Sequence, residues 1–599
     1  MKGIDKLKWL LFTLFPAAFF VFSQFSIGRD SFRHMEAQLF ILNILVFEAL
    51  AFLFLSISGN MKAALIAEMI PVQVLAVANS FIRIFRGSYI VPWDVIALQT
   101  AANVAGNYEY RMDRNALIGT AAFLIMFVLI LFLFPKEKIS IPGKKRFLTG
   151  AVSLAFILLL FFILPLEGPA KLLKIHNSRF AVTEYYTGNG IIPGLMVKLS
   201  EVPVKVPEGY SKEAEKSKLE SVEVSGTLPE TGDMPDVIVI MNEAFSDLAV
   251  DAPFKTNKDY MPFVHSLKGK ENTVTGHAHV SILGGATPNS EFEFLTGYSM
   301  AFLPENSIPF QAFIKKRTDS LGWYFSSLGY QTFASHPFLS SGWDRTVAWP
   351  NLGFEETLFL EDFEELNPEG MKVRDYVSDE AMYEALIKKI DEREDREKPL
   401  FAFNVTMQNH SGYSKMYDNL EKEIEVEGVD ESEGGHSQAL INYLDLIVKS
   451  DRAFEKLISH YENVDKKTVI LMYGDHQPDP GVAEPIYNLN GMDMDSLTPE
   501  DVMNDHVVPF VIWANYDIDE KEDVDISLNY LGNLLLKETG IPLTGYRTYL
   551  ESYSEEYPLI TAVGGRDSSG KLIDHKKLIE RLPDLSAAQY YELFDKYDE

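Results

Sequence analysis

The sequence has no cysteine among its 599 residues, and its basic residues are outnumbered, with 54 Lys and Arg against 85 Asp and Glu. The first absence excludes disulfides, which agrees with an exported domain that does without them. The second gives a formal net charge of −31, which argues against nucleic acid as a partner. An apolar fraction of 47% excludes a disordered polymer.

Charge and hydropathy divide the chain near Leu166. Residues 1–166 hold 15 basic and 9 acidic residues, whereas the remaining 433 hold 39 and 76. The first part contains five apolar runs that reach the roughly 20 residues needed to cross a bilayer. A cleavable signal peptide would not be followed by four more such runs. The predicted spans are residues 8–25, 37–58, 61–82, 116–134 and 147–166.

The short segments on one side of this predicted topology are rich in basic residues. The positive-inside rule assigns these segments to the cytoplasm, so five spans leave everything after Leu166 outside. The sequence therefore predicts a multi-pass protein of the cell membrane, with residues 1–166 in the bilayer, 167–234 as a connector and 235–599 as an extracellular domain. The nine basic residues are Lys2, Lys6, Lys8, Lys62, Lys136, Lys138, Lys144, Lys145 and Arg146.

Short apolar runs alternate with helical patterns from Pro235 onward. Such alternation predicts an α/β domain in which helices cover both faces of a mostly parallel sheet. The strands are expected in DVIVIM, YQTFAS, LFAFNV, TVILMY and FVIWA.

Polar side chains follow four of these strands: Glu243, His336, His410 and the pair Asp475–His476. Ligands bind beyond the carboxyl ends of the strands in open α/β sheets. One polar residue after a strand is commonly just the start of a loop, whereas four such strand ends predict a site.

The segment GGATPNSEFEFLTG adds a hydroxyl, that of Thr287. Pro288 is favoured at the first helical position and Glu291 falls in the opening turn, so Thr287 is predicted as the N-cap of a helix. Either Thr287 is only a cap, or the free N–H groups of that helix hold a tetrahedral anion beside it.

Three oxygens and one nitrogen come from Glu243, Asp475, His476 and the Thr287 hydroxyl. This set suits Mn²⁺ or Mg²⁺ and is also possible for Zn²⁺. A metal-bound threonine loses its proton more easily and becomes a usable nucleophile. The residues thus predict metal-assisted transfer of an anionic group through a threonine ester.

Several motifs occur in a fixed order: five spans, a strand ending at Glu243, T-x-x-S-E-F, H-x6-W-x-R, N-H and a strand ending in G-D-H. In this order they resemble the lipoteichoic acid synthase family of phosphoglycerol transferases, within the alkaline phosphatase/sulfatase superfamily. The resemblance implies that superfamily's fold and one divalent metal, preferably Mn²⁺. It implies that Glu243, Thr287, Asp475 and His476 hold the metal, that Thr287 is the nucleophile, and that His336, Trp343, Arg345 and His410 line a glycerol phosphate pocket.

The family's chemistry implies that Thr287 takes glycerol phosphate from phosphatidylglycerol, releases diacylglycerol and passes the group to a glycolipid or polyglycerolphosphate acceptor. Arg345 would neutralise the phosphate. His410, with a near-neutral pKa, would protonate the departing oxygen. Two departures, GATPNSE for G-K-T-S-D-S-E and W-D-R for W-N-R, leave open whether the chain is a polymer synthase, a primase or a related transferase.

Two alternatives use the same residues differently. The site could transfer phosphoethanolamine, or hydrolyse a phosphodiester or a sulfate ester, although the nucleophile segment lacks the C/S-x-P-x-R motif of sulfatases that use formylglycine. A membrane-anchored binding module would need no nucleophile, so the intact set of Glu243, Thr287, Asp475 and His476 argues against it.

The topology predicts where a protease can reach the chain. Protease added to intact cells stripped of their wall should cut near residues 212–218 and free a soluble fragment, because the connector lies outside. Immunoblotting of the released fraction measures this. A fragment that forms only after the membrane is opened would place the domain in the cytoplasm.

Overall fold

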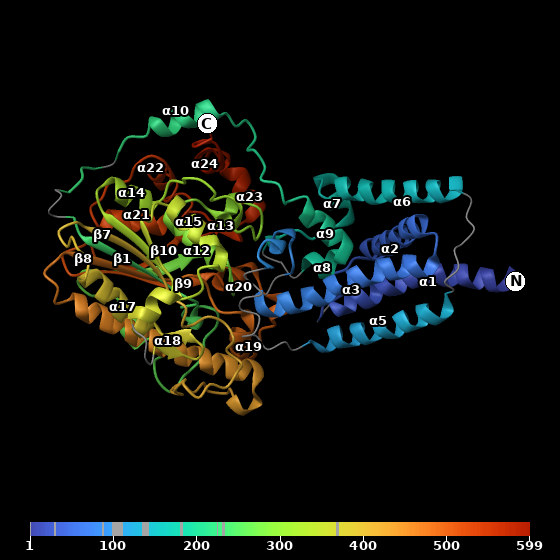
Figure 1. The fold of residues 1–599 in the computed structure, drawn as a ribbon, viewed down its shortest axis with the longest axis horizontal. Coiled ribbons are helices and arrows are strands. Elements are labelled where there is room, and N and C mark those ends of the chain that lie inside the picture. The colour runs from blue at the N-terminus through green and yellow to red at the C-terminus, as the bar shows by residue number, and fades with distance from the viewer. Residues whose placement is uncertain are drawn as a thin grey trace. The chain divides into compact units, whose positions relative to one another are not determined.

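The chain forms two compact units in a computed structural model (Figure 1). The helical unit comprises Met1–Asp94 and Tyr110–Pro203, and the α/β unit comprises Val95–Glu109 and Val204–Glu599. The structure describes residues 2–28, 31–86, 89–98, 112–134, 143–179, 184–224, 226–229, 234–366 and 371–598.

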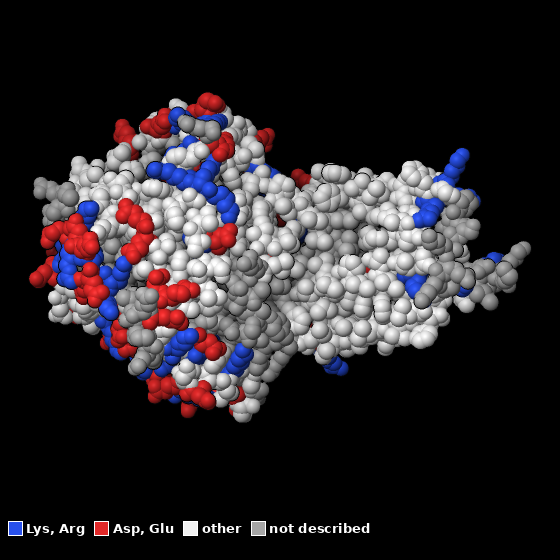
Figure 2. Space-filling model, viewed as in Figure 1, with Lys and Arg blue, Asp and Glu red and all other residues white. Residues whose placement is uncertain are grey.

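Five helices of the helical unit are long and apolar enough to cross a membrane, which confirms the five predicted apolar helices. Large apolar side chains point outward from them, for example Phe132 and Phe147, which are 83% and 78% exposed. An outward apolar surface of this kind suits lipid and not water. The face in view in Figure 2 shows few charged residues along these helices. They are α1 (Lys2–Ser26), α2 (Ala37–Ser58), α3 (Met61–Arg86), α5 (Arg114–Leu133) and α6 (Gly143–Ile163).

Short helices follow the last of these. Ser211 begins the charged one as its N-cap, because its hydroxyl accepts from the backbone N–H of Ala214. The short helices are α7 (Glu167–Leu173), α8 (Glu184–Asn189), α9 (Ile191–Leu199) and, in the α/β unit, α10 (Lys212–Glu220).

Eight strands of the α/β unit form one sheet in the order β10-β2-β9-β8-β1-β7-β3-β4. Neighbouring strands are parallel except where β9 pairs with β2 and β8, so the predicted mixed, mostly parallel sheet is confirmed. The strands are β1 (Asp236–Asn242), β2 (Thr273–His279), β3 (Gln331–Ser335), β4 (Glu356–Leu358), β7 (Leu400–Val405), β8 (Thr468–Gly474), β9 (Val507–Ala514) and β10 (Lys521–Ser527).

Two smaller sheets lie outside the main one. The hairpin of β5 and β6 comes between β4 and β7 in the chain, and the other sheet follows β10. Their strands are β5 (Lys372–Val373), β6 (Tyr376–Val377), β11 (Leu559–Ile560), β12 (Gly564–Arg566) and β13 (Leu572–Asp574).

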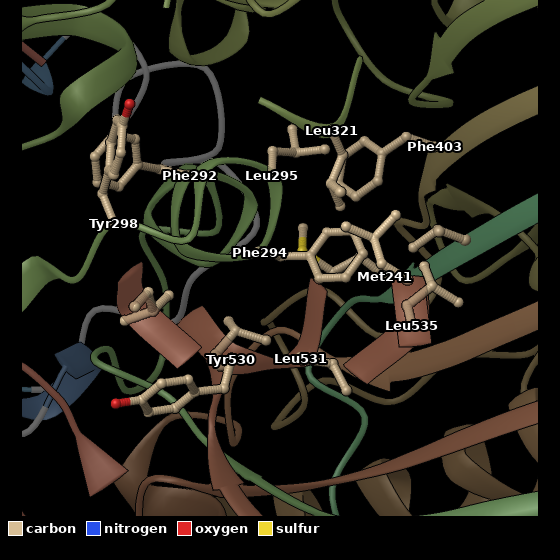
Figure 3. Packing of buried hydrophobic residues seen from close by; sticks show 14 of the residues in the cluster. Met241, Phe292, Phe294, Leu295, Tyr298, Leu321, Phe403, Tyr530, Leu531 and Leu535 are labelled. Atoms are coloured by element: carbon tan, nitrogen blue, oxygen red, sulfur yellow. The ribbon is translucent and has the colours of Figure 1, made fainter. Parts of the chain in front are cut away.

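Helices cover both faces of the main sheet. Alternate residues of β1 point to opposite sides, with Val239 and Met241 in one buried cluster and Ile238 and Ile240 in the other. Figure 3 shows Met241 within the first cluster, among residues of α12 and α21. Burial of each such side chain contributes about 1.5–3 kcal/mol. The first face is covered by α12 (Pro288–Thr296), α14 (Leu321–Ser327), α15 (Arg345–Asn351) and α21 (Leu528–Glu538), and the second by α17 (Asp379–Asp391) and α18 (Gly435–Tyr461).

The other helices of this unit are short. They are α11 (Pro262–Ser266), α13 (Pro309–Ala312), α16 (Leu360–Leu366), α19 (Pro480–Leu489), α20 (Pro499–Asn504), α22 (Tyr546–Glu551), α23 (His575–Arg581) and α24 (Pro583–Tyr590).

Parallel pairing aligns the carboxyl ends of β1, β7 and β8. Asn242 pairs with Gly474 across β1 and β8, so the residues that follow these two strands start side by side. Gly474 is required for this approach, since a Cβ there would lie 1.9 Å from the Phe245 carbonyl oxygen.

Gly474→Ala is therefore expected to destabilise the α/β unit by about 1–3 kcal/mol or more, the usual cost of overpacking. Thermal unfolding of the purified full chain, followed by circular dichroism, measures this loss. The matched control is Gly342→Ala, where the nearest atom to an added Cβ is 3.7 Å away. Equal melting temperatures for the two variants would contradict the close approach.

Candidate metal and nucleophile site

Three of the predicted metal ligands meet at the carboxyl edge of the sheet. Glu243, Asp475 and His476 each offer a ligand atom, and these atoms lie within 4.8 Å of one another. Nε2 of His476 is 3.2 Å from Oδ2 of Asp475 and 3.8 Å from Oε1 of Glu243. All three side chains are buried.

Hydrogen bonds orient two of these ligands inward. Nδ1 of His476 lies 2.7 Å from the Gln477 carbonyl oxygen, which can only accept, so Nδ1 carries the proton and Nε2 presents a lone pair. Oδ1 of Asp475 accepts from the backbone N–H groups of Ala244 and His476 at 2.7 and 2.8 Å. Oδ2 of Asp475 and Nε2 of His476 have no hydrogen-bond partner among the described residues.

This arrangement fits a divalent cation. Two lone-pair atoms 3.2 Å apart repel each other unless positive charge lies between them. Burial raises the pKa of Glu243 well above its usual range, and the charge of Asp475 adds to the effect. Burial also raises the pKa of Asp475. The donor set of carboxylate oxygens and imidazole nitrogen suits Mn²⁺, Mg²⁺ or Zn²⁺.

Thr287 lies immediately before α12, and its hydroxyl faces the ligand cluster. Oγ1 is 3.3 Å from Oε2 of Glu243 and makes no capping bond to the helix. The expectation that free N–H groups at this helix start would hold an anion is wrong. The N–H groups of Asn289, Ser290 and Glu291 donate to the carbonyl oxygens of Ala286 and Thr287, and proline at the first position has none.

Backbone strain accompanies these residues. Ala244 follows Glu243 with a φ of 47°, and Ala286 precedes Thr287 with a φ of 67°. Trp343 and Asp344 have φ values of 58° and 57°. Left-handed conformations at residues other than glycine cost about 1–3 kcal/mol each and cluster at functional sites.

Arg345 is bound to the helix that begins after the nucleophile. Its Nε and Nη2 donate to Oε1 of Glu291 at 2.9 and 2.6 Å, and Trp349 Nε1 donates to Oε2 at 2.9 Å. The Arg345 and Glu291 side chains are 2% and 0% exposed. The charge of Arg345 is therefore compensated inside the protein. The sequence placed Glu291 only in the opening turn and did not reveal this pair.

Two predicted pocket histidines, His336 and His410, have depressed pKa values. Burial and the neighbouring Arg345 lower the pKa of His336 well below its usual range, and its Nδ1 contacts the Val405 carbonyl oxygen at 3.1 Å. Burial, followed by the charge of Arg374, lowers the pKa of His410 to about 3. The predicted near-neutral pKa of His410 is therefore wrong, because the ring is buried and lies near the charge of Arg374.

Tyr376 and Arg374 surround His410 and were missed by sequence reasoning. Nδ1 of His410 is 3.3 Å from the Tyr376 hydroxyl, and Nη2 of Arg374 donates to the His410 carbonyl oxygen at 2.6 Å. The site thus joins Glu243, Thr287, Asp475 and His476 directly. The charge of Arg345 influences the pKa values of Glu243, His336 and His410, so these residues lie near one another. Trp343 is half-buried two positions before Arg345.

Comparison with known proteins places this site in a family. The model of the Sulfatase family matches residues 235–541, just over half of the chain. The chain belongs to the Sulfatase family. All eight predicted site residues fall within the match, from Glu243 to His476. The finer likeness to lipoteichoic acid synthases stays a prediction.

Two curated relatives come from Rhizobium meliloti. One, whose name refers to cyclic beta-1,2-glucan modification, is 31% identical over 386 residues, which are 63% of this chain and 57% of that protein. The other, the capsular polysaccharide biosynthesis protein RkpI, is 25% identical over 253 residues, 41% of each chain. The chain spans about half the length of the curated relatives it matches.

Two solved structures share the fold. Streptococcus pyogenes phosphoglycerol transferase GacH has a TM-score of 0.50 and 20% identity, covering 65% of this chain and 94% of its own. The lipooligosaccharide phosphoethanolamine transferase EptA from Neisseria meningitidis has a TM-score of 0.52 and 13% identity, covering 88% and 95%. The second likeness extends beyond the α/β unit.

The ligand cluster predicts one bound divalent metal per chain. Asp475→Asn and His476→Gln should each lower metal occupancy at least about tenfold, because each removes a ligand atom or its charge. Elemental analysis of protein dialysed against Mn²⁺ measures occupancy without any assay of activity. His460→Gln in α18 is the control. Unchanged metal content in both ligand variants would contradict the site.

Proposed function

We propose that this protein is a membrane-anchored, metal-dependent phosphotransferase that moves glycerol phosphate from phosphatidylglycerol to a hydroxyl of a glycolipid or another glycan acceptor outside the membrane. The observation that carries the proposal is the Thr287 hydroxyl, 3.3 Å from Glu243, beside the unpartnered Oδ2 of Asp475 and Nε2 of His476. A buried hydroxyl facing a cation site is the arrangement of a covalent nucleophile.

The relatives support the substrate class. GacH is a phosphoglycerol transferase whose structure is a complex with sn-glycerol-1-phosphate. The two Rhizobium meliloti relatives are named for glucan modification and capsular polysaccharide biosynthesis. These names favour glycerol phosphate as the group and a glycan as the acceptor. EptA supports the broader class of phosphotransferases.

The chain's own residues account for two displacement steps. Glu243, Thr287, Asp475 and His476 would hold one divalent metal, which supplies charge that favours the ionised threonine hydroxyl. Oγ1 of Thr287 forms a bond to phosphorus while the bond to the diacylglycerol oxygen breaks. The hydroxyl proton leaves toward Oε2 of Glu243, which already accepts its hydrogen bond, and the same proton then passes to the departing diacylglycerol oxygen. In the second step an acceptor hydroxyl oxygen forms a bond to phosphorus while the bond from phosphorus to Oγ1 of Thr287 breaks. The acceptor's proton passes to Oγ1 through Glu243 and restores the Thr287 hydroxyl.

Neutral histidines suit substrate binding in this scheme. Nδ1 of His410 faces the hydroxyls of Tyr376 and Ser411, each at 3.3 Å. When Nδ1 accepts from these donors, Nε2 carries the proton and donates to substrate oxygen. His410 therefore serves as a hydrogen-bond donor to the glycerol phosphate, and its depressed pKa leaves it no extra proton to deliver.

Thr287→Ala should abolish diacylglycerol release from labelled phosphatidylglycerol with Mn²⁺ present. The fold should survive, because the hydroxyl does not cap α12 and its loss costs no more than about 1 kcal/mol. Thr296→Ala, a buried threonine at the other end of the same helix, is the matched control. Residual activity of Thr287→Ala above a few per cent would remove Thr287 from the nucleophile role.

Mass spectrometry identifies the covalent species. Wild-type protein quenched during turnover should carry glycerophosphate on the peptide that contains Thr287, and phosphatidylethanolamine assayed in parallel should give no adduct. An adduct formed only from phosphatidylethanolamine would replace glycerol phosphate with phosphoethanolamine as the transferred group.

A further inference from the structure

Arg374 is a buried cation beside the site that no expected role explains. It occupies the turn between β5 and β6, and its side chain is 4% exposed. Nη2 donates to the carbonyl oxygens of Gln408 and His410 at 2.8 and 2.6 Å. Arg374 therefore holds the loop after β7 that carries His410.

The charge of Arg374 is not compensated by a carboxylate. Its side-chain hydrogen bonds go to neutral carbonyls, and it forms no ion pair with any described residue, in contrast to Arg345. Nε and Nη1 are buried and have no hydrogen-bond partner in the part of the chain that the structure describes. Burial of a charge without an opposite charge is unfavourable, so the position retains a cost that a bound anion would remove.

The surroundings fix the guanidinium in place. The rings of Tyr376, Tyr413 and Tyr417 lie 5.3 to 5.6 Å from its central carbon, within the range of cation–π attraction. The backbone of Arg374 has a φ of 55°, in the left-handed region that favours glycine. Holding the loop does not by itself explain an arginine in a strained turn between three aromatic rings, because strained backbone is unfavourable and clusters at functional sites.

The charge of Arg374 reaches the site. After burial, it is the largest influence on the pKa of His410, ahead of His476 and Arg345. Arg374 thus influences the ring of His410, as does His476, which belongs to the cation site. The charge of Arg345 is compensated by Glu291. Of these two arginines, Arg374 is therefore the one whose positive charge can attract a bound anion.

We infer that Arg374 binds a phosphate oxygen of the substrate, with Nη2 holding the His410 loop while Nε, Nη1 and the uncompensated charge face the anion. The inference rests on the proposed phosphotransfer and adds to it a second residue that determines affinity for the phosphate. The shared chemistry is a phosphate anion, whether in a lipid headgroup or free in solution.

Isothermal titration of the full chain in detergent, loaded with Mn²⁺, tests this inference through binding, and the Thr287→Ala background prevents turnover of the lipid probe. The probes are inorganic phosphate, glycerol phosphate and a short-chain phosphatidylglycerol. Arg374→Gln should weaken binding at least about tenfold, the usual effect of losing a charge-assisted hydrogen bond. Arg374→Lys, which keeps the charge, should recover most of the affinity. Loss with all three probes indicates recognition of phosphate itself, and loss with the lipid alone indicates the headgroup diester.

Arg547→Gln is the matched control, since Arg547 is also a buried arginine bonded to a backbone carbonyl, that of Leu295. It should lower the melting temperature and leave affinity unchanged. Wild-type affinity in Arg374→Gln, or equal loss in Arg374→Gln and Arg374→Lys, would overturn the inference and leave the proposed function standing. A wild-type chain that binds none of the probes would overturn both.

Discussion

Negative charge buried at one edge of the sheet is the constraint on which this site depends. Parallel pairing of β1 with β8 places the residue after Asn242 next to the residue after Gly474, so Glu243 and Asp475 cannot separate without loss of register. Backbone N–H groups satisfy only Oδ1 of Asp475. Oδ2 of Asp475 and the Nε2 lone pair of His476 are stable side by side only with a cation or a proton between them. The pKa values of Glu243 and Asp475 are raised for the same reason, since burial disfavours their negative charge.

The two buried arginines near the site have different roles. Arg345 is neutralised by Glu291 and so fixes the first turn of α12, four residues after Thr287. Arg374 has no such partner and clamps the loop of His410. His336 and His410 stay neutral because of their burial and these charges. A phosphate group fits between a cation site and uncharged N–H donors, since both sides gain from its negative charge.

Much of the fold could be predicted from continuous apolar runs. Each predicted strand is buried on both faces, and each predicted span is long enough for a bilayer. Three strands of the main sheet were missed. β2 reads TVTGHAH and has no continuous apolar run. β4 is an edge strand of three residues, and the other edge strand, β10, reads KEDVDIS, where charges replace the apolar signal.

The site could be predicted where a polar residue follows a strand or, for Thr287, begins a helix. Glu243 and Asp475 are next to strong strand signals, whereas Arg374 lies in a two-strand hairpin and bonds a carbonyl 36 positions away. The partner of Arg345, the pKa of His410 and the occupied N–H groups of α12 depend on which groups meet after folding. No local sequence pattern predicts these contacts, because pairing and burial are set by tertiary packing.

The departures from the lipoteichoic acid synthase motifs leave this machinery intact. Proline at position 288 removes an N–H group that would lack a helical partner in any case, and its fixed φ suits the first turn. Because the other N–H groups of that turn bond to carbonyls, Thr287 has no backbone donor to cap, and its hydroxyl is available to Glu243. Asp344, in place of the asparagine, pairs with Lys315 at 2.9 Å on the surface. The changed residues at 286, 288 and 289 flank Thr287 but leave its hydroxyl and its contact with Glu243 in place, so the nucleophile survives both departures.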